Sequence, residues 1–444
     1  MRHFLPVIGL IVIGLVGCKD TTTSTTKSSV AQLTAFGFSA DSDYPGLSAA
    51  TFKVEERLDT GLVYNPDSIT YATSLDSVVP KFTFAATPGS AVMQTPDTTI
   101  VLGGSDTINF TRQPLYLTVK SQDGTNTKVY ELRAYVHQVD PDLYHWEQLC
   151  SQVLTDNSEQ RVVALGEQFV SISNNGFRTS VCLSTDGNVW SSGQTPAGLP
   201  DGCHVRRIIS DGNTLYYADS ITLYTSADAL VWTASDYSGR DFRIINMLMA
   251  WNDTVWAIAE DKQGVVLAKM QDNQLKLTDL RPKTTFPVSD FATVCFENAA
   301  GRARAMVLGG RAGNGCVLNA RWNLEYSPAV GYRMQNFSID RPNFTDLTGA
   351  SVIWYNHQLL MFGGVDADMH YLGREILVSN DEGLNWTAAD TAKNHLPEAY
   401  TARQKQSVMV RDNAIYVFGG EQQDQTFSDV YRGRLNSIDW NDKN

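Results

Sequence analysis

Arginine and aspartate side chains recur over residues 141–444 of this 444-residue chain, and they are the residues best suited to bind a polar ligand. The earlier part of this range supplies mainly arginine and the later part mainly aspartate. Such a mixed set, with tyrosine nearby, suits a sugar or a polar protein surface, because guanidinium groups donate and carboxylates accept hydrogen bonds. The candidate ligand-binding residues are Arg161, Arg207, Arg243, Asp290, Arg311, Asp346, Asp366, Asp368, His370, Tyr400 and Arg403.

The residue types that catalysis needs do not form a recognisable pattern. No Cys-x-x-Cys or His–Cys cluster indicates zinc, and no two histidines after residue 140 have a spacing that indicates a shared metal. Gly-x-Ser-x-Gly, Walker A and His-Glu-x-x-His sequences are absent. We therefore expect no catalytic residue, no metal and no cofactor. The alternative is a carbohydrate-active enzyme, a hydrolase or lyase, in which Asp290 and Asp366 serve as paired carboxylates.

Three hydrophobic segments that end in a glycine pair recur along this part of the chain. They occupy residues 306–310, 360–364 and 416–420, and their first glycines, Gly309, Gly363 and Gly419, are 54 and 56 residues apart. A glycine pair lets the backbone turn tightly where a Cβ atom would clash. The spacing indicates an internal repeat of one β-rich unit.

A second repeated pattern joins serine, aspartate and tryptophan. It is complete in residues 379–386 (SNDEGLNW) and one residue shorter in residues 184–190 and 226–232. We expect the aspartate to accept hydrogen bonds from backbone N–H groups of a turn, a glycine to take a positive φ, and the tryptophan to pack between sheets.

These two patterns resemble known repeats of β-propellers. The glycine-pair segments resemble the kelch motif, and the second pattern resembles the Asp-box of sialidase-like propellers, which implies a structural role for Asp186, Asp228 and Asp381. The ligand sets of galactose-oxidase-like copper enzymes and of sialidases are not identifiable. In propellers of this kind, the loops between second and third strands and those between successive sheets emerge on one face. The resemblance therefore implies that the candidate residues surround a central channel.

The number of blades follows from counting strands. Second strands are expected near Phe169, Leu215, Val255, Met306, Leu360 and Tyr416. Outer strands number one more, so we expect residues 144–149 to meet the C-terminal strand, which ends near Trp440, in one blade. This closure protects an open sheet edge. The prediction is six blades, with seven as the alternative.

Residues 31–140 form a separate unit of short strands. Residues 115–119 and 129–136 alternate apolar and polar side chains around a turn at Asp123-Gly124, as a hairpin packed on one face requires. This ending resembles that of Ig-like modules in bacterial surface lipoproteins, and the strand spacing fits a small β-sandwich. We expect an all-β protein with an Ig-like sandwich over residues 31–140 and a propeller over residues 141–444.

The N-terminus predicts where the protein works. Residues 1–17 have a short basic start and an apolar segment too short to span a bilayer, so they form a signal peptide. Residues 15–18 resemble the lipobox of bacterial lipoproteins, which implies lipidation of Cys18; an ordinary secretory signal is the alternative. Residues 18–30 are a Thr/Ser-rich tether. The whole arrangement resembles two-domain propeller lipoproteins of Bacteroidetes-type bacteria.

Composition limits the partners. The formal net charge of −13 argues against a nucleic-acid partner, because such binding needs a basic surface. We expect a protein of the cell envelope that Cys18 acyl chains anchor in the outer membrane, periplasmic or surface-exposed. Its expected function is non-catalytic recognition of a glycan or an envelope protein by the propeller loops. A purely structural role in an assembly is a further alternative.

Overall fold

The computed structural model describes residues 26–151, 153, 159–282, 285–338, 346–389 and 394–436. Its contacts divide the chain into two compact units, and the division falls between Asp140 and Pro141. Regular structure in the described residues is β-strand, apart from two single-turn 3₁₀ helices, Leu47–Ala49 and Val205–Arg207. None of the described helices has the length and apolar character needed to cross a membrane.

The first unit contains a two-stranded and a six-stranded sheet. The small sheet pairs β1 (Leu33–Phe38) with β4 (Pro80–Phe84). The large sheet has the order β2 (Lys53–Glu55), β3 (Thr60–Tyr64), β8 (Thr127–Leu132), β7 (Leu115–Lys120), β5 (Ser90–Gln94), β6 (Thr99–Val101). β7 and β8 form the antiparallel hairpin that the alternation predicts, whereas β3 and β8 run parallel.

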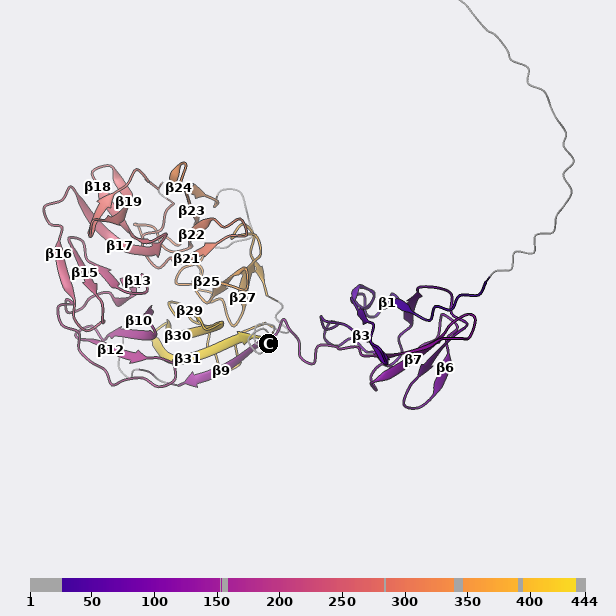
Figure 1. The fold of residues 1–444 in the computed structure, drawn as a ribbon. Coiled ribbons are helices and arrows are strands. Elements are labelled where there is room, and N and C mark those ends of the chain that lie inside the picture. Colours follow the sequence, from indigo (N-terminus) through magenta and orange to yellow (C-terminus); the bar gives the residue numbers. More distant parts are fainter. Residues whose placement is uncertain are drawn as a thin grey trace, which may run out of the picture. The chain divides into compact units, whose positions relative to one another are not determined.

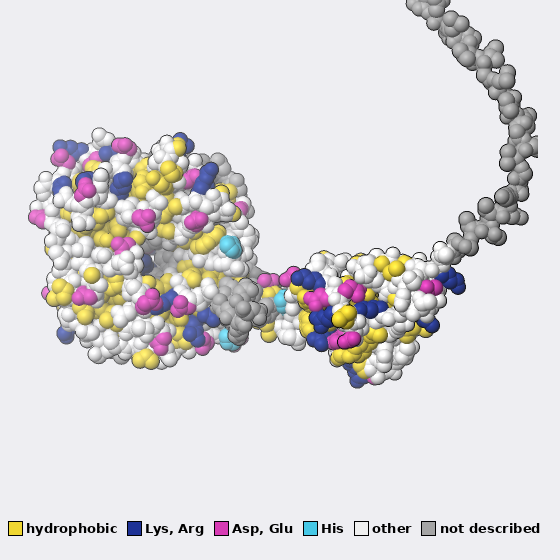
Figure 2. All heavy atoms as spheres, in the orientation of Figure 1, with side chains coloured by type: hydrophobic (Ala, Val, Ile, Leu, Met, Phe, Trp, Pro, Cys, Tyr) yellow, Lys and Arg dark blue, Asp and Glu magenta, His cyan; other side chains and the backbone are white. Residues whose placement is uncertain are grey.

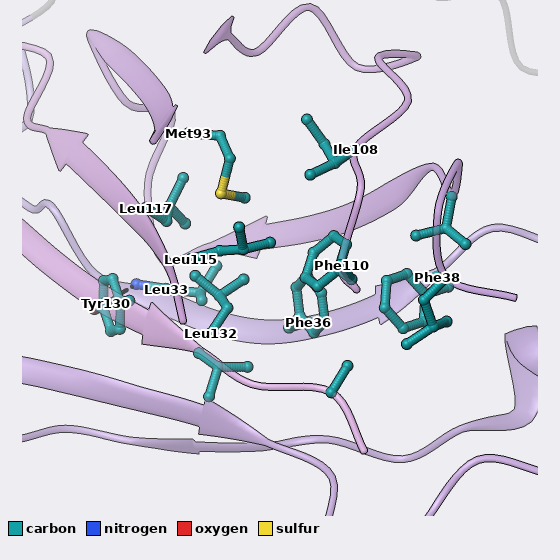
Figure 3. Close-up of a cluster of buried hydrophobic side chains, with 14 of the residues drawn as sticks. Leu33, Phe36, Phe38, Met93, Ile108, Phe110, Leu115, Leu117, Tyr130 and Leu132 are labelled. Carbon is teal, nitrogen blue, oxygen red and sulfur yellow. Dashed lines mark hydrogen bonds between the residues drawn. The ribbon is translucent and has the colours of Figure 1, made fainter. Parts of the chain in front are cut away.

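The core of the first unit is apolar and rich in phenylalanine. Phe36 and Phe38 of β1 contact Phe110, with ring centroids 5.9 and 5.1 Å away (Figure 3). Leu115 and Leu117 from β7 are fully buried in the same cluster, because alternate residues of a strand point to the same face.

The described residues of the second unit form six antiparallel sheets that follow one another in chain order, and Figure 1 shows them arranged in a ring. The first three contain β10 (Glu159–Leu165), β11 (Gln168–Asn174) and β12 (Thr179–Ser184); β13 (Ile209–Ser210), β14 (Leu215–Ala218), β15 (Thr222–Ser226) and β16 (Thr233–Asp236); and β17 (Phe242–Trp251), β18 (Thr254–Asp261), β19 (Gly264–Gln271) and β20 (Gln274–Leu277).

The last three sheets complete this ring. They contain β21 (Ala292–Glu297), β22 (Ala303–Leu308), β23 (Arg321–Ser327) and β24 (Gly331–Asn336); β25 (Ser351–Tyr355), β26 (Gln358–Phe362), β27 (Ile376–Ser379) and β28 (Thr387–Ala388); and β29 (Ser407–Arg411), β30 (Ala414–Gln422), β31 (Gln425–Leu435) and β9 (Tyr144–Cys150). All six residues predicted near second strands lie in the second strand of their sheet.

The ends of the second unit close the ring. β9 pairs with β31, with Trp146 opposite Gly433, so the first strand of the unit is the outermost strand of the last sheet. The last sheet also packs on the first, where Phe169 lies 4.8 Å from Tyr416 between ring centroids. The predicted meeting of residues 144–149 with the C-terminal strand is confirmed up to Leu435, and Trp440 lies outside the described residues.

The glycine pairs make the close approaches that the sequence predicts. Gly309 has φ +59°, and a Cβ atom there would lie 2.1 Å from the backbone oxygen of Leu347. Gly363 has φ +54°, and its Cβ would lie 2.5 Å from the oxygen of Arg403. Since an L-residue would need both an unfavourable φ and a displaced neighbour, glycine is required at these strand ends.

The three Ser-x-Asp turns have the predicted contacts. The Asp381 carboxylate accepts the N–H of Asn385 at 2.8 Å, and the indole of Trp386 donates to the Gly383 oxygen at 3.2 Å. Asp186 and Asp228 accept backbone N–H groups in the same way. Backbone N–H donors hold the pKa of both of these carboxyl groups below the usual value of an aspartate. The three aspartates therefore stabilise turns.

Candidate functional site at the polar mouth of the central channel

A channel enclosed by the six sheets contains two adjoining cavities, with volumes of about 280 and 300 Å³. The innermost strands β10, β13, β17, β21, β25 and β29 line it. Residues such as Arg161, Leu248, Thr293 and Ser351 border both cavities, so the two are continuous. Figure 2 shows a hollow near the centre of the second unit.

The two ends of the channel differ in chemistry. The first cavity is lined by charged and polar side chains at the starts of the inner strands. The second is lined by residues such as Val294, Val352 and Met409. Cys295 lies at this less polar end, where its thiol donates to the Ala250 oxygen at 3.4 Å. We take the first cavity, the polar mouth, as the candidate site.

Three of the predicted residues line the polar mouth: Arg161, Arg207 and Asp290. Arg161 is the third residue of β10, and Arg207 ends the short 3₁₀ helix before β13. Arg311 joins this group through an ion pair with Asp290, 3.7 Å between Nε and Oδ2. Four of the predicted residues therefore lie at or beside the polar mouth.

Other predicted residues lie elsewhere on the second unit. Arg243 pairs with Glu260 and borders a separate pocket beside Phe286. Asp366 accepts the backbone N–H of His370 at 2.8 Å and lies 3.1 Å from Nδ1 of its ring. These contacts lower the pKa of Asp366 by more than burial raises it. Asp368 is exposed and Asp346 half-buried, and neither borders the polar mouth.

The prediction that Tyr400 and Arg403 form an accessible rim is wrong. Their exposed fractions are 3% and 1%. The Arg403 guanidinium lies 4.3 Å from the Tyr400 ring centroid and 3.9 Å from that of Phe427, and it makes a two-pronged ion pair with Asp429. Because two aromatic rings and a carboxylate surround it, Arg403 holds neighbouring strands together.

Six residues at the mouth are outside the predicted set: Glu159, His204, Arg206, Asn246, Lys405 and the adjacent Glu421. His204, Arg206 and Lys405 lie in the same inter-sheet loops as the predicted Arg207 and Arg403, so the sequence pointed to those loops, whereas Glu159, Asn246 and Glu421 were missed. Glu159 is two residues before Arg161 on β10, and residues at this spacing share one face of a strand. Glu421 directly follows a glycine pair.

The carboxylates at the mouth already have cationic or N–H partners. Glu421 pairs with Arg206 and, at 2.9 Å, with Lys405. Glu159 lies 3.7 Å from the His204 ring and accepts the N–H of Arg206 at 3.4 Å.

Arg161 is different, because its side chain has no hydrogen-bond or ion-pair partner among the described residues, and its Nε is shielded from solvent. Burial, and next the positive charge of Arg206, lowers the pKa of its guanidinium.

The comparisons with known proteins place both units in families. Residues 140–443 match the family model described as "DUF6242 beta propeller domain". The chain belongs to the DUF6242 family. Residues 20–134 match the model described as the N-terminal domain of the same family, a domain of unknown function. This DUF6242 chain is thus an all-β protein whose second unit is a β-propeller domain.

More distant comparisons add little to this family assignment. A solved structure described as "Structure of YjhT" matches this DUF6242 chain with a TM-score of 0.47 and 10% identity, over 64% of this chain and 96% of the other. In sequence, none of the curated proteins matches the chain.

Proposed function

We propose that this protein is a lipid-anchored receptor of the cell envelope that binds a glycan without catalysis at the polar mouth of its propeller channel. The observation that carries this proposal is the polar mouth itself, where segments of all six sheets converge on one concave cavity. Such a cavity can surround one or two sugar units, whereas an interface with another protein usually buries a much broader surface.

Direct polar contacts support binding better than aromatic stacking. Tyr400 is buried, and Tyr371 is half-exposed but borders a different pocket. The side chains that line the mouth instead offer guanidinium, ammonium, carboxylate and amide groups. A ligand rich in hydrogen-bonding groups suits this lining.

A carbohydrate-active enzyme is the second candidate. The predicted pair of Asp290 and Asp366 does not border one cavity, but Glu159 and Asp290 both line the polar mouth. Two carboxylates in one cavity are what glycoside cleavage requires. Incubation of bound glycans with the protein, followed by product analysis, tests this alternative, since released sugars or unsaturated products require catalysis.

The architecture that presents the mouth is part of the proposal. We infer six blades of kelch and Asp-box type, because six apolar clusters join successive sheets and the sixth joins the last sheet to the first. We also infer an Ig-like first unit that spaces the propeller from the membrane. Its hairpin and two-sheet core support this inference, while the parallel β3–β8 pair departs from an all-antiparallel sandwich.

The proposed lipid anchor requires acylation of Cys18, which lies outside the described residues. Metabolic labelling with a fatty acid and membrane fractionation test it. The native chain should carry the label and sediment with the outer membrane, and Cys18→Ser should lose both properties. Labelling that persists in Cys18→Ser would contradict the lipoprotein assignment.

The binding function is tested with a glycan array probed by the full chain in detergent. Thr293 borders both cavities, so Thr293→Phe places an aromatic ring in the channel. Thr233→Phe is the matched control, because Thr233 is exposed on the outer strand β16. We expect specific glycan binding by the native chain and by Thr233→Phe, and its loss in Thr293→Phe. Binding that survives Thr293→Phe would place the site elsewhere, and an array without binding would favour a protein ligand.

A further inference from the structure

Arg161 is a cation inside the propeller channel for which the described part of the protein supplies no counterion. We propose that the polar mouth is an oxyanion site, in which Arg161 binds a carboxylate or phosphate group of the ligand. This inference rests on the proposed function, since it names the chemical class of ligand that the mouth accepts.

The position of Arg161 on its strand directs it toward the channel. Gln160, the preceding residue on β10, is buried and its side chain donates to the Phe427 oxygen, while Val162, the following residue, borders only the second cavity. Glu159 and Arg161, on the other face of the strand, both line the mouth. Arg161 is half-buried because part of its surface borders the cavity while its Nε is covered.

The carboxylates near Arg161 are engaged by other groups. Glu421 holds Arg206 and Lys405, and Asp290 holds Arg311. Glu159 contacts His204 and the backbone of Arg206. Arginine does not lose its proton in proteins, and a charged group withdrawn from water is costly unless it is paired. A bound anion would relieve this cost.

The charge around the mouth favours an anion. The lining side chains and their ion-pair partners include five cations, Arg161, Arg206, Arg207, Lys405 and Arg311, against three carboxylates, Glu159, Asp290 and Glu421. A cavity lined mainly by charges of one sign, within walls of low dielectric constant, concentrates ligands of the opposite charge. This excess of positive charge stands out in a chain whose formal net charge is −13.

The shape of a guanidinium group further limits the class of ligand that can bind. Arginine presents parallel N–H donors that match the two oxygens of a carboxylate or phosphate. Arg206 is already held by Glu421, so it adds positive potential near Arg161 rather than a free fork. The class of ligand is therefore a small molecule with one compact oxyanion, such as a uronic acid or a sugar phosphate.

Binding to the full chain at low ionic strength tests the proposal. The probes are acetate, inorganic phosphate, D-glucuronate and D-glucose 6-phosphate, with neutral D-glucose as the matched ligand, and calorimetry gives each Kd. We expect saturable binding of at least one anion, at least about tenfold tighter than D-glucose, because a hydrogen bond to a charged group contributes that much. The anions that bind distinguish a carboxylate site from a phosphate site.

Two variants separate the site from general charge effects. Arg161→Met should weaken anion binding at least about tenfold, and Arg161→Lys should retain an intermediate affinity because it keeps the charge and loses the fork. Arg243→Met is the control, since it removes one positive charge away from the channel. Thermal unfolding of each variant shows that it is folded.

The outcomes distinguish this inference from the proposed function. If no probe anion binds the native chain, or if Arg161→Met binds anions like the native chain, the oxyanion site is wrong. If neutral glycans bind on the array and their binding is unchanged in Arg161→Met, the oxyanion site is wrong and glycan binding stands. If anion binding depends on Arg161 but no glycan on the array binds, the oxyanion site is supported and the proposed glycan binding is contradicted.

Discussion

Arg161 and Arg403 are two enclosed arginines of the same propeller, and their surroundings are opposite. Arg403 lies between two aromatic rings, donates to the oxygens of Thr401 and Gly419, and pairs with Asp429. Arg161 borders a cavity and has no such partner among the described residues. The first arrangement satisfies a charge within the protein, and the second leaves a charge available to a ligand.

This difference shows why burial alone does not identify a binding residue. A buried charge with a full set of partners contributes to the structure, and its removal leaves the partner uncompensated. A charge that borders a cavity without a partner costs free energy in the empty protein, and such groups concentrate at functional sites. Three substitutions test this distinction.

The largest effect is expected for Arg403→Met. It leaves the Asp429 carboxylate, 13% exposed, without its ion-pair partner and removes the cation from between Tyr400 and Phe427. The free energy of unfolding should fall by about 3–5 kcal/mol, measured by urea denaturation. For Arg243→Met, whose pair with Glu260 is exposed, the loss should stay below about 1 kcal/mol. Equal losses in the two variants would contradict a structural role for Arg403.

A smaller loss of unfolding free energy is expected for Asp381→Ala. This substitution tests whether hydrogen bonds to a carboxylate that is not deeply buried stabilise the fold. Burial alone would raise the Asp381 pKa, but hydrogen bonds from Asn385, Ser379 and Leu384 outweigh it and lower the pKa below the usual value of an aspartate. The substitution should cost about 1–2 kcal/mol at neutral pH. Asp368→Ala is the exposed control and should cost less than about 0.5 kcal/mol.

The pH dependence of this Asp381 difference has a defined sign. Because the folded pKa lies below the unfolded value of about 3.9, the stabilisation is fully present above that pH and is lost as pH falls through the folded pKa. Urea denaturation of both proteins over acidic pH should therefore show the gap between native chain and Asp381→Ala closing. A gap that widens on acidification would contradict the assigned hydrogen bonds.

The smallest effect on stability is expected for Arg161→Met. The substitution removes a charge that lacks a partner and keeps a side chain of similar length, so unfolding free energy should stay within about 1 kcal/mol of the native value or rise. Urea denaturation without added anions checks this. Destabilisation as large as that expected for Arg403→Met would show that Arg161 is structural.

Local patterns were sufficient to predict the repeated elements of this protein. The glycine pairs predicted where backbones approach closely, since Gly309 and Gly363 have positive φ angles and no space for a Cβ atom. The serine and aspartate spacing predicted the turns at Asp186, Asp228 and Asp381, because these hydrogen bonds join residues two to four positions apart. The strand count predicted the pairing of β9 with β31.

Only the tertiary structure separated the candidate residues from one another. Arg161, Arg207 and Arg403 look alike in the sequence, because each is an arginine expected in a loop between successive sheets. Their difference depends on groups far along the chain: Asp429 and Phe427 reach Arg403, whereas the carboxylates that could reach Arg161 are held by Arg206, Lys405 and Arg311. The sequence by itself determined the repeats and their turns, because these depend on neighbouring residues. The tertiary structure decided which arginine has a partner and which remains available to a ligand, because ring closure places distant side chains together.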